Sequence, residues 1–234
     1  DIQFNTRVAA AHYREGTRSW EIVLEDGARH TTRFLITAIG VLSAPTMPNN
    51  IPGIASFKGQ SCHTHNWPRE GIDFAGKRVG IIGTGATAVQ AIQEIAKTVG
   101  RLTVFQRNPN WCVPQHNGRI SKEEMRDIRE RYHEILALCR TTPSCYIHGP
   151  DPRATFEATP EERAALWEKR YGEPGFALWQ GNFRDTLTDR AANALASEFI
   201  ANKIRSRVHD PVVAERLIPK NHGVGTRRMP LESG

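Results

Sequence analysis

A glycine turn that links an apolar strand to a helix constrains the fold of this 234-residue chain more than any other feature. The run Arg78–Ile82 predicts a short buried strand, and Gly83-x-Gly85-x-x-Ala88 follows it directly. Residues 86–99 then predict a helix with one apolar face, made of Val89, Ile92 and Ile95. A second strand is expected at 102–105. Together these elements predict a βαβ unit and therefore an α/β fold with parallel strands.

The glycine turn has the residue types that a dinucleotide phosphate needs close to the backbone. Gly83 permits a tight turn, Gly85 lets the backbone approach a pyrophosphate, and Ala88 lets helix and strand pack closely. The N–H groups and the partial positive charge of the helix N-terminus would face the phosphates. The alternative is a glycine turn that binds no ligand. The candidate cofactor-binding residues are Gly83, Thr84, Gly85, Ala86, Thr87 and Ala88.

The end of the second strand indicates which dinucleotide is bound. Sites for NAD usually place Asp or Glu there, where the carboxylate binds the ribose 2′-hydroxyl. This chain has Gln106-Arg107-Asn108 instead. Arg107 can form charge-assisted hydrogen bonds with a 2′-phosphate, so NADPH is favoured over NADH. The alternative is an ordinary surface arginine at a strand end.

Composition and charge exclude several classes of function. The 31 Lys and Arg against 25 Asp and Glu give a formal net charge of +6. Most of the arginines alternate with acidic residues at helical spacing and do not cluster as a nucleic-acid site requires. No apolar run approaches the roughly 18 residues that a membrane-spanning helix needs. We therefore expect neither a nucleic acid nor a membrane as a partner.

The cysteines indicate neither a disulfide scaffold nor a metal site. The chain has 4 Cys and no Cys-x-x-Cys pair, so we expect reduced thiols in a cytoplasmic protein. Cys62, His63 and His65 are neighbours in the sequence, but their spacing suits zinc poorly and no second ligand pair follows. We expect no bound metal.

The remaining residues predict β structure near the N-terminus and helices further along. Strands are expected at 7–13 and 19–24, and the apolar run 33–40 predicts a strand buried on both faces. The proline-rich residues 43–53 predict a linker or a crossover. Helices are predicted at 121–139, from 159 onward, at 189–207 and from 210 onward, the first two opened by capping boxes.

A longer motif precedes the glycine turn, and it carries a family resemblance. Phe57-x-Gly59-x-x-x-His63-x-x-x-Trp67-Pro68 resembles, at every fixed position, the fingerprint of the Baeyer–Villiger monooxygenases, the class B flavoprotein monooxygenases. Thr37-Ala38-Ile39-Gly40 with Leu42-Ser43-x-Pro45 resembles the segment that leaves the family's FAD domain. Val104-Phe105-Gln106-Arg107-x-Pro109 and Gly225-Thr226-Arg227-Arg228 also resemble family segments.

The resemblance implies an FAD- and NADPH-dependent enzyme that converts a ketone to an ester or lactone. In the family, NADPH reduces the flavin, O₂ forms a flavin C4a-peroxide, and the peroxide attacks the ketone. The implied fold is a Rossmann-like NADPH-binding domain with a helical insertion, preceded by the C-terminal part of a β-rich FAD-binding domain. The implied boundaries are 1–45 for the partial FAD domain, 46–76 for the linker, 77–120 for the NADPH-binding βαβ unit, 121–218 for the insertion and 219–234 for the return segment.

The resemblance also assigns roles by position. Arg228 would be the active-site arginine beside the flavin peroxide and the nicotinamide, a role that suits an always-charged guanidinium. Arg107 and Arg227 would hold the 2′-phosphate. The family often has Lys in place of Arg227, a change that keeps the charge. It often has Thr in place of Asn108, which leaves one phosphate hydrogen bond open.

Three further residues receive roles from the resemblance. His63 would lie in the domain linker and couple domain movement to catalysis without transferring a proton. Ala38 and Gly40 would belong to the cofactor-binding residues on the FAD side.

The chain is expected to be an internal piece of a longer protein. It begins at Asp1 without Met, and it carries one glycine fingerprint, at Gly83, where the family has another for FAD near its N-terminus. We therefore expect the isolated chain to hold NADPH weakly, not to retain FAD, and to be inactive as a monooxygenase.

Two other functions stay open at this point. The N- or S-oxidising flavin monooxygenases share the fold and cofactors, but their related motif usually ends without the Trp67-Pro68 pair. A non-catalytic NADPH-binding module, such as a redox sensor, would explain the glycine turn and Arg107 but neither the fingerprint nor Arg228.

Overall fold

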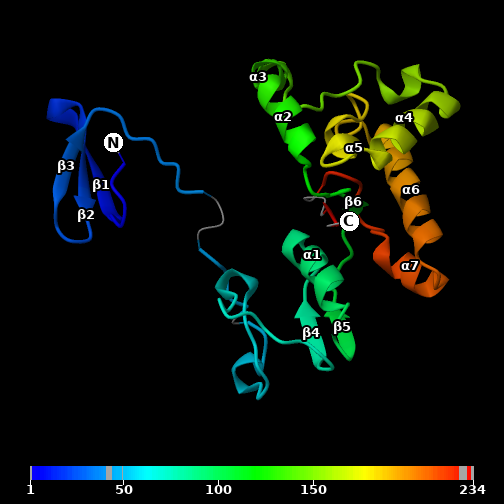
Figure 1. The fold of residues 1–234 in the computed structure, drawn as a ribbon, viewed down its shortest axis with the longest axis horizontal. Helices are drawn as coiled ribbons and strands as arrows, with labels where there is room; N and C mark the ends of the chain where they lie inside the picture. The colour runs from blue at the N-terminus through cyan, green and yellow to red at the C-terminus, as the bar shows by residue number, and fades with distance from the viewer. Residues whose placement is uncertain (1, 41–43, 49, 227–230, 233–234) are drawn as a thin grey trace. The chain divides into compact units, whose positions relative to one another are not determined.

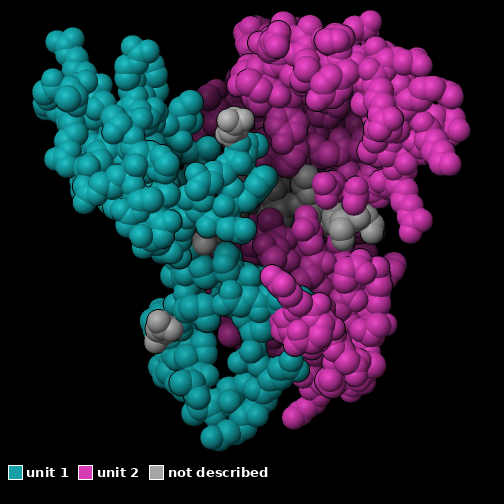
Figure 2. Space-filling view, turned by 60° about the vertical axis from the view of Figure 1, so that its left-hand side comes forward, with its two compact units in different colours: residues 1–67 teal, residues 68–234 magenta. Residues whose placement is uncertain are grey.

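The computed structural model describes residues 2–40, 44–48, 50–226 and 231–232. The chain divides into two compact units, Asp1–Trp67 and Pro68–Gly234, which Figure 2 colours separately. Both units contain strands, and the second also contains the α-helices (Figure 1). The chain is thus an α/β protein, as the sequence predicts.

The first unit is built on a three-stranded antiparallel sheet in the order β1-β2-β3. β1 (Val8–Arg14) pairs with β2 (Ser19–Leu24), which pairs with β3 (Arg29–Thr32), and a single turn of 3₁₀ helix, η1 (Glu15–Thr17), joins the first two. The strands predicted at 7–13 and 19–24 are confirmed to within one residue.

The apolar run 33–40 is not the buried strand that its composition predicts. β3 ends at Thr32, and residues 33–40 form neither helix nor strand. The side chains of Phe34, Ile36 and Ile39 are 78%, 88% and 78% exposed. A strand buried on both faces needs neighbouring strands and a layer over each face. The described residues of this unit place neither around the run, so the prediction is wrong for this structure.

The rest of the first unit has little regular structure. The described residues of the proline-rich stretch 43–53 form no helix or strand, as expected of a linker. Two short 3₁₀ helices follow, η2 (Ile54–Ser56) and η3 (Thr64–Asn66).

The second unit begins with the predicted βαβ arrangement. β4 (Arg78–Ile82) and β5 (Arg101–Phe105) are parallel and in register, and α1 (Ala86–Ile95) connects them. The helix ends at Ile95, four residues before the predicted end at residue 99, and the chain turns there. A second parallel pair joins β6 (Val113–Pro114) to β7 (Leu231–Glu232), two segments far apart in the sequence.

The helix predicted at 121–139 is two helices, α2 (Lys122–Glu130) and α3 (Tyr132–Thr141). The backbone leaves helical geometry at Arg131, with φ −96° and ψ 11°. The Arg131 guanidinium donates hydrogen bonds to Asp127 before the break and to Glu134 after it, so side-chain bonds span the break. The capping box predicted at the start of α2 is confirmed.

The other helices begin where their capping residues predict. Thr159 caps α4, Asp189 caps α6 and Asp210 caps α7, each through a side-chain oxygen that accepts a backbone N–H. The bounds of these elements are η4 (Thr155–Glu157), α4 (Pro160–Gly172), α5 (Ala177–Gln180), α6 (Arg190–Arg207) and α7 (Pro211–Leu217).

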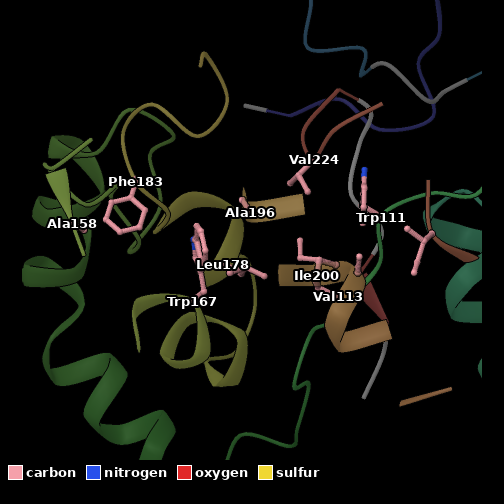
Figure 3. Packing of buried hydrophobic residues seen from close by; sticks show 11 residues of the cluster. Trp111, Val113, Ala158, Trp167, Leu178, Phe183, Ala196, Ile200 and Val224 are labelled. Atoms are coloured by element: carbon pink, nitrogen blue, oxygen red, sulfur yellow. The ribbon is translucent and has the colours of Figure 1, made fainter. Parts of the chain in front are cut away.

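The main hydrophobic core lies among the helices of the second unit (Figure 3). Trp167 of α4 packs edge-on against Phe183 with 6.1 Å between ring centroids. Its indole Nε1 donates to Asn182 Oδ1 at 2.9 Å, so the buried polar atom is satisfied. The same core includes Trp111, Ile200 of α6 and Val224. Trp111 and Trp167 are buried, and Trp179 packs against the cluster.

Candidate functional site

The glycine turn lies at the carboxyl ends of both parallel strands. Gly83 has φ +100°, a backbone conformation that favours glycine because a Cβ would be strained there. Its N–H donates to the carbonyl oxygen of Phe105 at 2.9 Å, which fastens the turn to the end of β5. In open α/β sheets, ligands bind outside the carboxyl ends of the strands. The turn has the position that a phosphate-binding loop requires.

The N-terminus of α1 is open to an anion. Gly85 is the N-cap residue, and no side chain caps the helix there. A Cβ built on Gly85 would meet no heavy atom within 4 Å, so a ligand can approach this backbone closely. The N–H groups of the first helical turn have no intrahelical partners. This arrangement suits a pyrophosphate, and Ala88 is half-buried where the helix approaches the strands.

The structure places Arg107 and Asn108 beside the same turn. Thr84 Oγ1 lies 3.4 Å from the carbonyl oxygen of Asn108, within hydrogen-bond range, so the loop and the end of β5 are adjacent. Gln106 Nε2 donates to the Arg216 carbonyl at 3.0 Å, which attaches the end of β5 to the last turn of α7. Arg107 is exposed, and no described carboxylate lies within ion-pair distance of its guanidinium. The charge is available to a phosphate.

The return segment reaches the same region. β7 pairs with β6 and contacts α1, the helix that follows the glycine turn. Arg227 and Arg228 lie outside the described residues, between Thr226 and β7. The structure therefore does not test the roles predicted for Arg227 and Arg228.

The fingerprint motif lies at the end of the first unit. A Cβ on Gly59 would lie 2.6 Å from the Phe57 ring, so the glycine lets the ring fold over the backbone. His63 Nδ1 accepts a hydrogen bond from the His65 backbone N–H at 3.1 Å and caps η3. The division between the two units falls between Trp67 and Pro68. The motif thus lies next to a unit boundary.

The FAD-side residues of the prediction lie in the first unit. Ala38 and Gly40 are exposed in the segment that follows β3. Leu42 and Ser43 of the same motif are outside the described residues. The cofactor role of Ala38 and Gly40 stays a prediction.

Within the described residues, an ion-pair cluster joins α6 to α7 and to Lys220, which follows α7. Glu215 accepts hydrogen bonds from Lys220 and from Arg205 Nε, the latter at 2.7 Å. These two cations lower the pKa of Glu215 to about 2. Arg205 also donates to Glu198 at 2.8 Å. These groups form a structural ion-pair cluster and are not poised as a catalytic acid or base.

Some structural findings bear on the other predicted partners. Among the described residues, Cys62, Cys112, Cys139 and Cys145 form no disulfide. Within residues 2–40, 44–48, 50–226 and 231–232, no three His, Cys, Asp or Glu side chains are grouped to hold a metal ion. Over the same residues, no helix is long and apolar enough to cross a membrane.

Two residues that the sequence did not single out contact the return segment. Asn193 and Ser197 lie on α6 and hydrogen-bond to the backbone of Val224. Asn193 and Ser197 are four residues apart in α6, and each directly follows a buried alanine, Ala192 or Ala196. Polar side chains next to buried positions need hydrogen-bond partners, so this spacing is a signal in the sequence. The partner itself, about 30 residues further along, has no such signal.

Comparison with known proteins identifies the family. Residues 1–137 match the family of flavin-binding monooxygenase-like proteins. A monooxygenase of Pseudomonas putida that acts on 2-oxo-Delta(3)-4,5,5-trimethylcyclopentenylacetyl-CoA is 48% identical, with 99% of this chain and 43% of the relative covered. Cyclohexanone 1,2-monooxygenase of an Acinetobacter species is 41% identical, with 94% and 40% covered.

Solved structures give the same result. OTEMO in complex with FAD and NADP is similar, with a TM-score of 0.90, 48% identity, and 98% of this chain and 44% of that chain covered. An oxidised steroid monooxygenase bound to NADP has a TM-score of 0.92 and 39% identity, with 100% and 44% covered.

A glycine turn, an uncapped helix N-terminus and a basic strand end define a candidate dinucleotide-binding α/β protein. The match covers more than half of the chain, and the chain belongs to the flavin-binding monooxygenase-like family. The resemblance to Baeyer–Villiger monooxygenases is confirmed by the curated relatives. The chain spans less than half the length of these relatives.

Proposed function

We propose that the chain is the NADPH-binding part of a flavin-dependent monooxygenase that inserts one oxygen atom next to a ketone carbonyl. One observation carries the proposal: the glycine turn, the N-terminus of α1 and the Arg107-Asn108 pair lie together at the ends of two parallel strands. These residues offer backbone N–H donors and a positive charge at the same edge of the strand pair. Two similar solved proteins are complexes with NADP, which supports the assignment.

The residues of this surface fit NADPH. The pyrophosphate would lie against the backbone at Gly83 and Gly85, where a Cβ on the second glycine would occupy open space. Thr84, Ala86, Thr87 and Ala88 complete the loop. Arg107, with Asn108 beside it, would hold the 2′-phosphate through charge-assisted hydrogen bonds. Arg227 would add a second cation to the same phosphate.

The oxygen chemistry belongs to FAD, which passes electrons from NADPH to O₂ when it is bound. The contribution of this chain is electrostatic and positional. Arg228 would present a permanently charged guanidinium to the nicotinamide and to the negative charge that develops beside the flavin. His63, at the boundary of the units, would couple domain movement to catalysis. Ala38 and Gly40 would contact FAD.

The finer domain organisation is part of the proposal. Residues 1–45 would be part of an FAD-binding domain and 46–76 a linker. The Rossmann-like NADPH-binding unit would be 77–120, the helical insertion 121–218 and the return segment 219–234. The relatives support this order, because the match to them extends over nearly the whole chain. A small ketone and O₂ would be the substrates, and a cytoplasmic location stays a prediction.

Product analysis tests the proposed function. The intact protein, loaded with FAD, is incubated with NADPH, O₂, a panel of cyclic and linear ketones, and a tertiary amine. We expect ester or lactone from at least one ketone, with NADPH consumed in equal amount. Formation of N-oxide without ester would favour the N- or S-oxidising group. NADPH binding with no oxidation by O₂ would favour a non-catalytic module.

A further inference from the structure

Gln106 attaches the end of β5 to a distant helix. Its side chain is half-buried, and its Nε2 donates to the carbonyl of Arg216, 110 residues further along the chain, at 3.0 Å. Arg216 lies in the last turn of α7, where backbone carbonyls have no partner within the helix. The Gln106 amide therefore satisfies one of these carbonyls, and it fixes the residue that directly precedes Arg107.

A second side chain holds the other end of the same loop. Trp111 is 4% exposed, and its indole Nε1 donates to the His222 carbonyl at 3.0 Å. The ring belongs to the hydrophobic core of the second unit (Figure 3). Residues 107–110 therefore lie between two fixed points, one at Gln106 and one at Trp111.

Both hydrogen bonds end on one short segment, residues 216–222, which is itself held in place. Ile218 is 3% exposed and belongs to the core, and Pro219 is also buried. Lys220 forms an ion pair with Glu215 of α7. The two bonds therefore attach the loop to a part of the unit that packing and an ion pair fix.

The glycine turn holds the loop from a third side. The Gly83 N–H donates to the Phe105 carbonyl at 2.9 Å, and Thr84 Oγ1 lies 3.4 Å from the Asn108 carbonyl. These contacts join the loop to the turn that is proposed to bind the pyrophosphate. Arg107 itself is exposed. The backbone on both sides of Arg107 is therefore fixed, while the residue remains open to a ligand.

We propose that Gln106 is a positioning residue for Arg107 in the recognition of the 2′-phosphate of NADPH. This inference rests on the proposed function. A planar guanidinium binds phosphate through two parallel hydrogen bonds, so its direction of approach matters. Fixing the residue before Arg107 limits the directions from which the guanidinium can approach. Gln106 acts through the backbone, because its amide is bonded to the Arg216 carbonyl.

The expected signature is a partial loss of selectivity for the 2′-phosphate. Without the Gln106 bond, the end of β5 would take more conformations, and the guanidinium would be aligned with the phosphate for less of the time. NADP⁺ would then bind more weakly, whereas NAD⁺, which has no 2′-phosphate, would be little affected. One lost hydrogen bond corresponds to a decrease of about three- to tenfold in the ratio of the dissociation constants for NAD⁺ and NADP⁺.

The test uses Gln106→Met, which keeps the length of the side chain and removes the amide. Thr142→Val is the matched control, because Thr142 is also half-buried and its Oγ1 donates to a backbone carbonyl of the same unit, that of Tyr146, at 2.6 Å. Dissociation constants for NADP⁺ and NAD⁺ are measured by calorimetry on the FAD-loaded intact protein. A thermal melt of each variant shows whether it is folded.

A double variant separates positioning from a general loss of stability. If Gln106 acts through Arg107, Gln106→Met lowers the ratio in the wild-type protein but not in the Arg107→Gln protein, which has no guanidinium to align. A decrease of the same size in both proteins would overturn the positioning role.

The proposal predicts a lower ratio in Gln106→Met and the wild-type ratio in Thr142→Val. If Gln106→Met does not fold, Gln106→Asn decides the question, because the shorter side chain withdraws the amide from the Arg216 carbonyl. A folded Gln106 variant with the wild-type ratio would overturn the positioning role and leave the proposed function intact. A wild-type protein without any preference for NADP⁺ would contradict the proposed function itself.

Discussion

The βαβ segment and the helical part of the second unit differ in how many of their side chains are buried. Between β4 and the end of β5, Ile95 is the one buried residue, and Ile82 and Phe105 are 65% and 57% exposed. The helical part contains the main core, from Trp111 to Val224. The residues proposed to bind NADPH therefore lie in the segment that buries least. The buried core of this unit lies among the helices, whereas we propose that the strand ends recognise the cofactor.

The largest expected effect is on the helical core. Trp167→Ala removes a side chain that is 6% exposed, and it leaves Asn182 Oδ1 with one donor fewer. We expect a loss of about 3–5 kcal/mol in the free energy of unfolding, measured by urea denaturation. The control Phe156→Ala removes a ring that is 59% exposed and should cost much less. Equal losses in the two variants would show that burial in the helical core does not account for the stability of this unit.

At the glycine turn we expect a smaller loss of stability than in the helical core, together with a loss of NADP⁺ affinity. Gly83→Ala forces a side chain into a backbone with φ +100° and should cost about 1–2 kcal/mol in folding. Because the turn would relax away from the phosphate position, NADP⁺ affinity should fall as well. The control is Gly118→Ala, where a Cβ meets nothing within 4 Å. Unchanged NADP⁺ affinity in a folded Gly83→Ala protein would argue against a phosphate at this turn.

The smallest effect concerns the surface cluster around Glu215 and depends on pH. Lys220 and Arg205 hold the pKa of Glu215 at about 2, below its ordinary value of 4.5. The cluster therefore stabilises the fold above pH 4.5, and this contribution disappears as the pH falls toward 2. Glu215→Gln should melt slightly below wild type at pH 7, and the difference should shrink at lower pH. Glu123→Gln, at an exposed position in α2, should show no such trend.

Local signals in the sequence predicted most of the fold. The starts of α4, α6 and α7 follow from capping side chains within one turn, so neighbouring residues are enough to define them. The strand predicted at 33–40 was wrong for the opposite reason. A buried apolar strand needs other strands beside it, and the composition of the run does not show whether they are present. The break at Arg131 also has no strong local signal, since neither Gly nor Pro is present there.

The contacts in and near the candidate site also differ in whether the sequence predicts them. The glycine turn and Arg107 could be predicted to lie together, because parallel strands end at one edge and the turn follows the first strand. The hydrogen bonds from Asn193 and Ser197 to the Val224 backbone could not be predicted, because nothing in the sequence near Asn193 specifies Val224 as its partner. Contacts of this kind depend on tertiary packing and become visible only in the structure.

We propose above that Arg107, at the end of β5, recognises the 2′-phosphate of NADPH. The most direct test is the ratio of the dissociation constants for NAD⁺ and NADP⁺ in wild type, Arg107→Gln and the control Arg101→Gln, an exposed arginine at the other end of the same strand. We predict that Arg107→Gln reduces the ratio by about ten- to a hundredfold, as expected for a lost charged hydrogen bond, while Arg101→Gln leaves it unchanged. An unchanged ratio in folded Arg107→Gln would show that Arg107 does not recognise the 2′-phosphate.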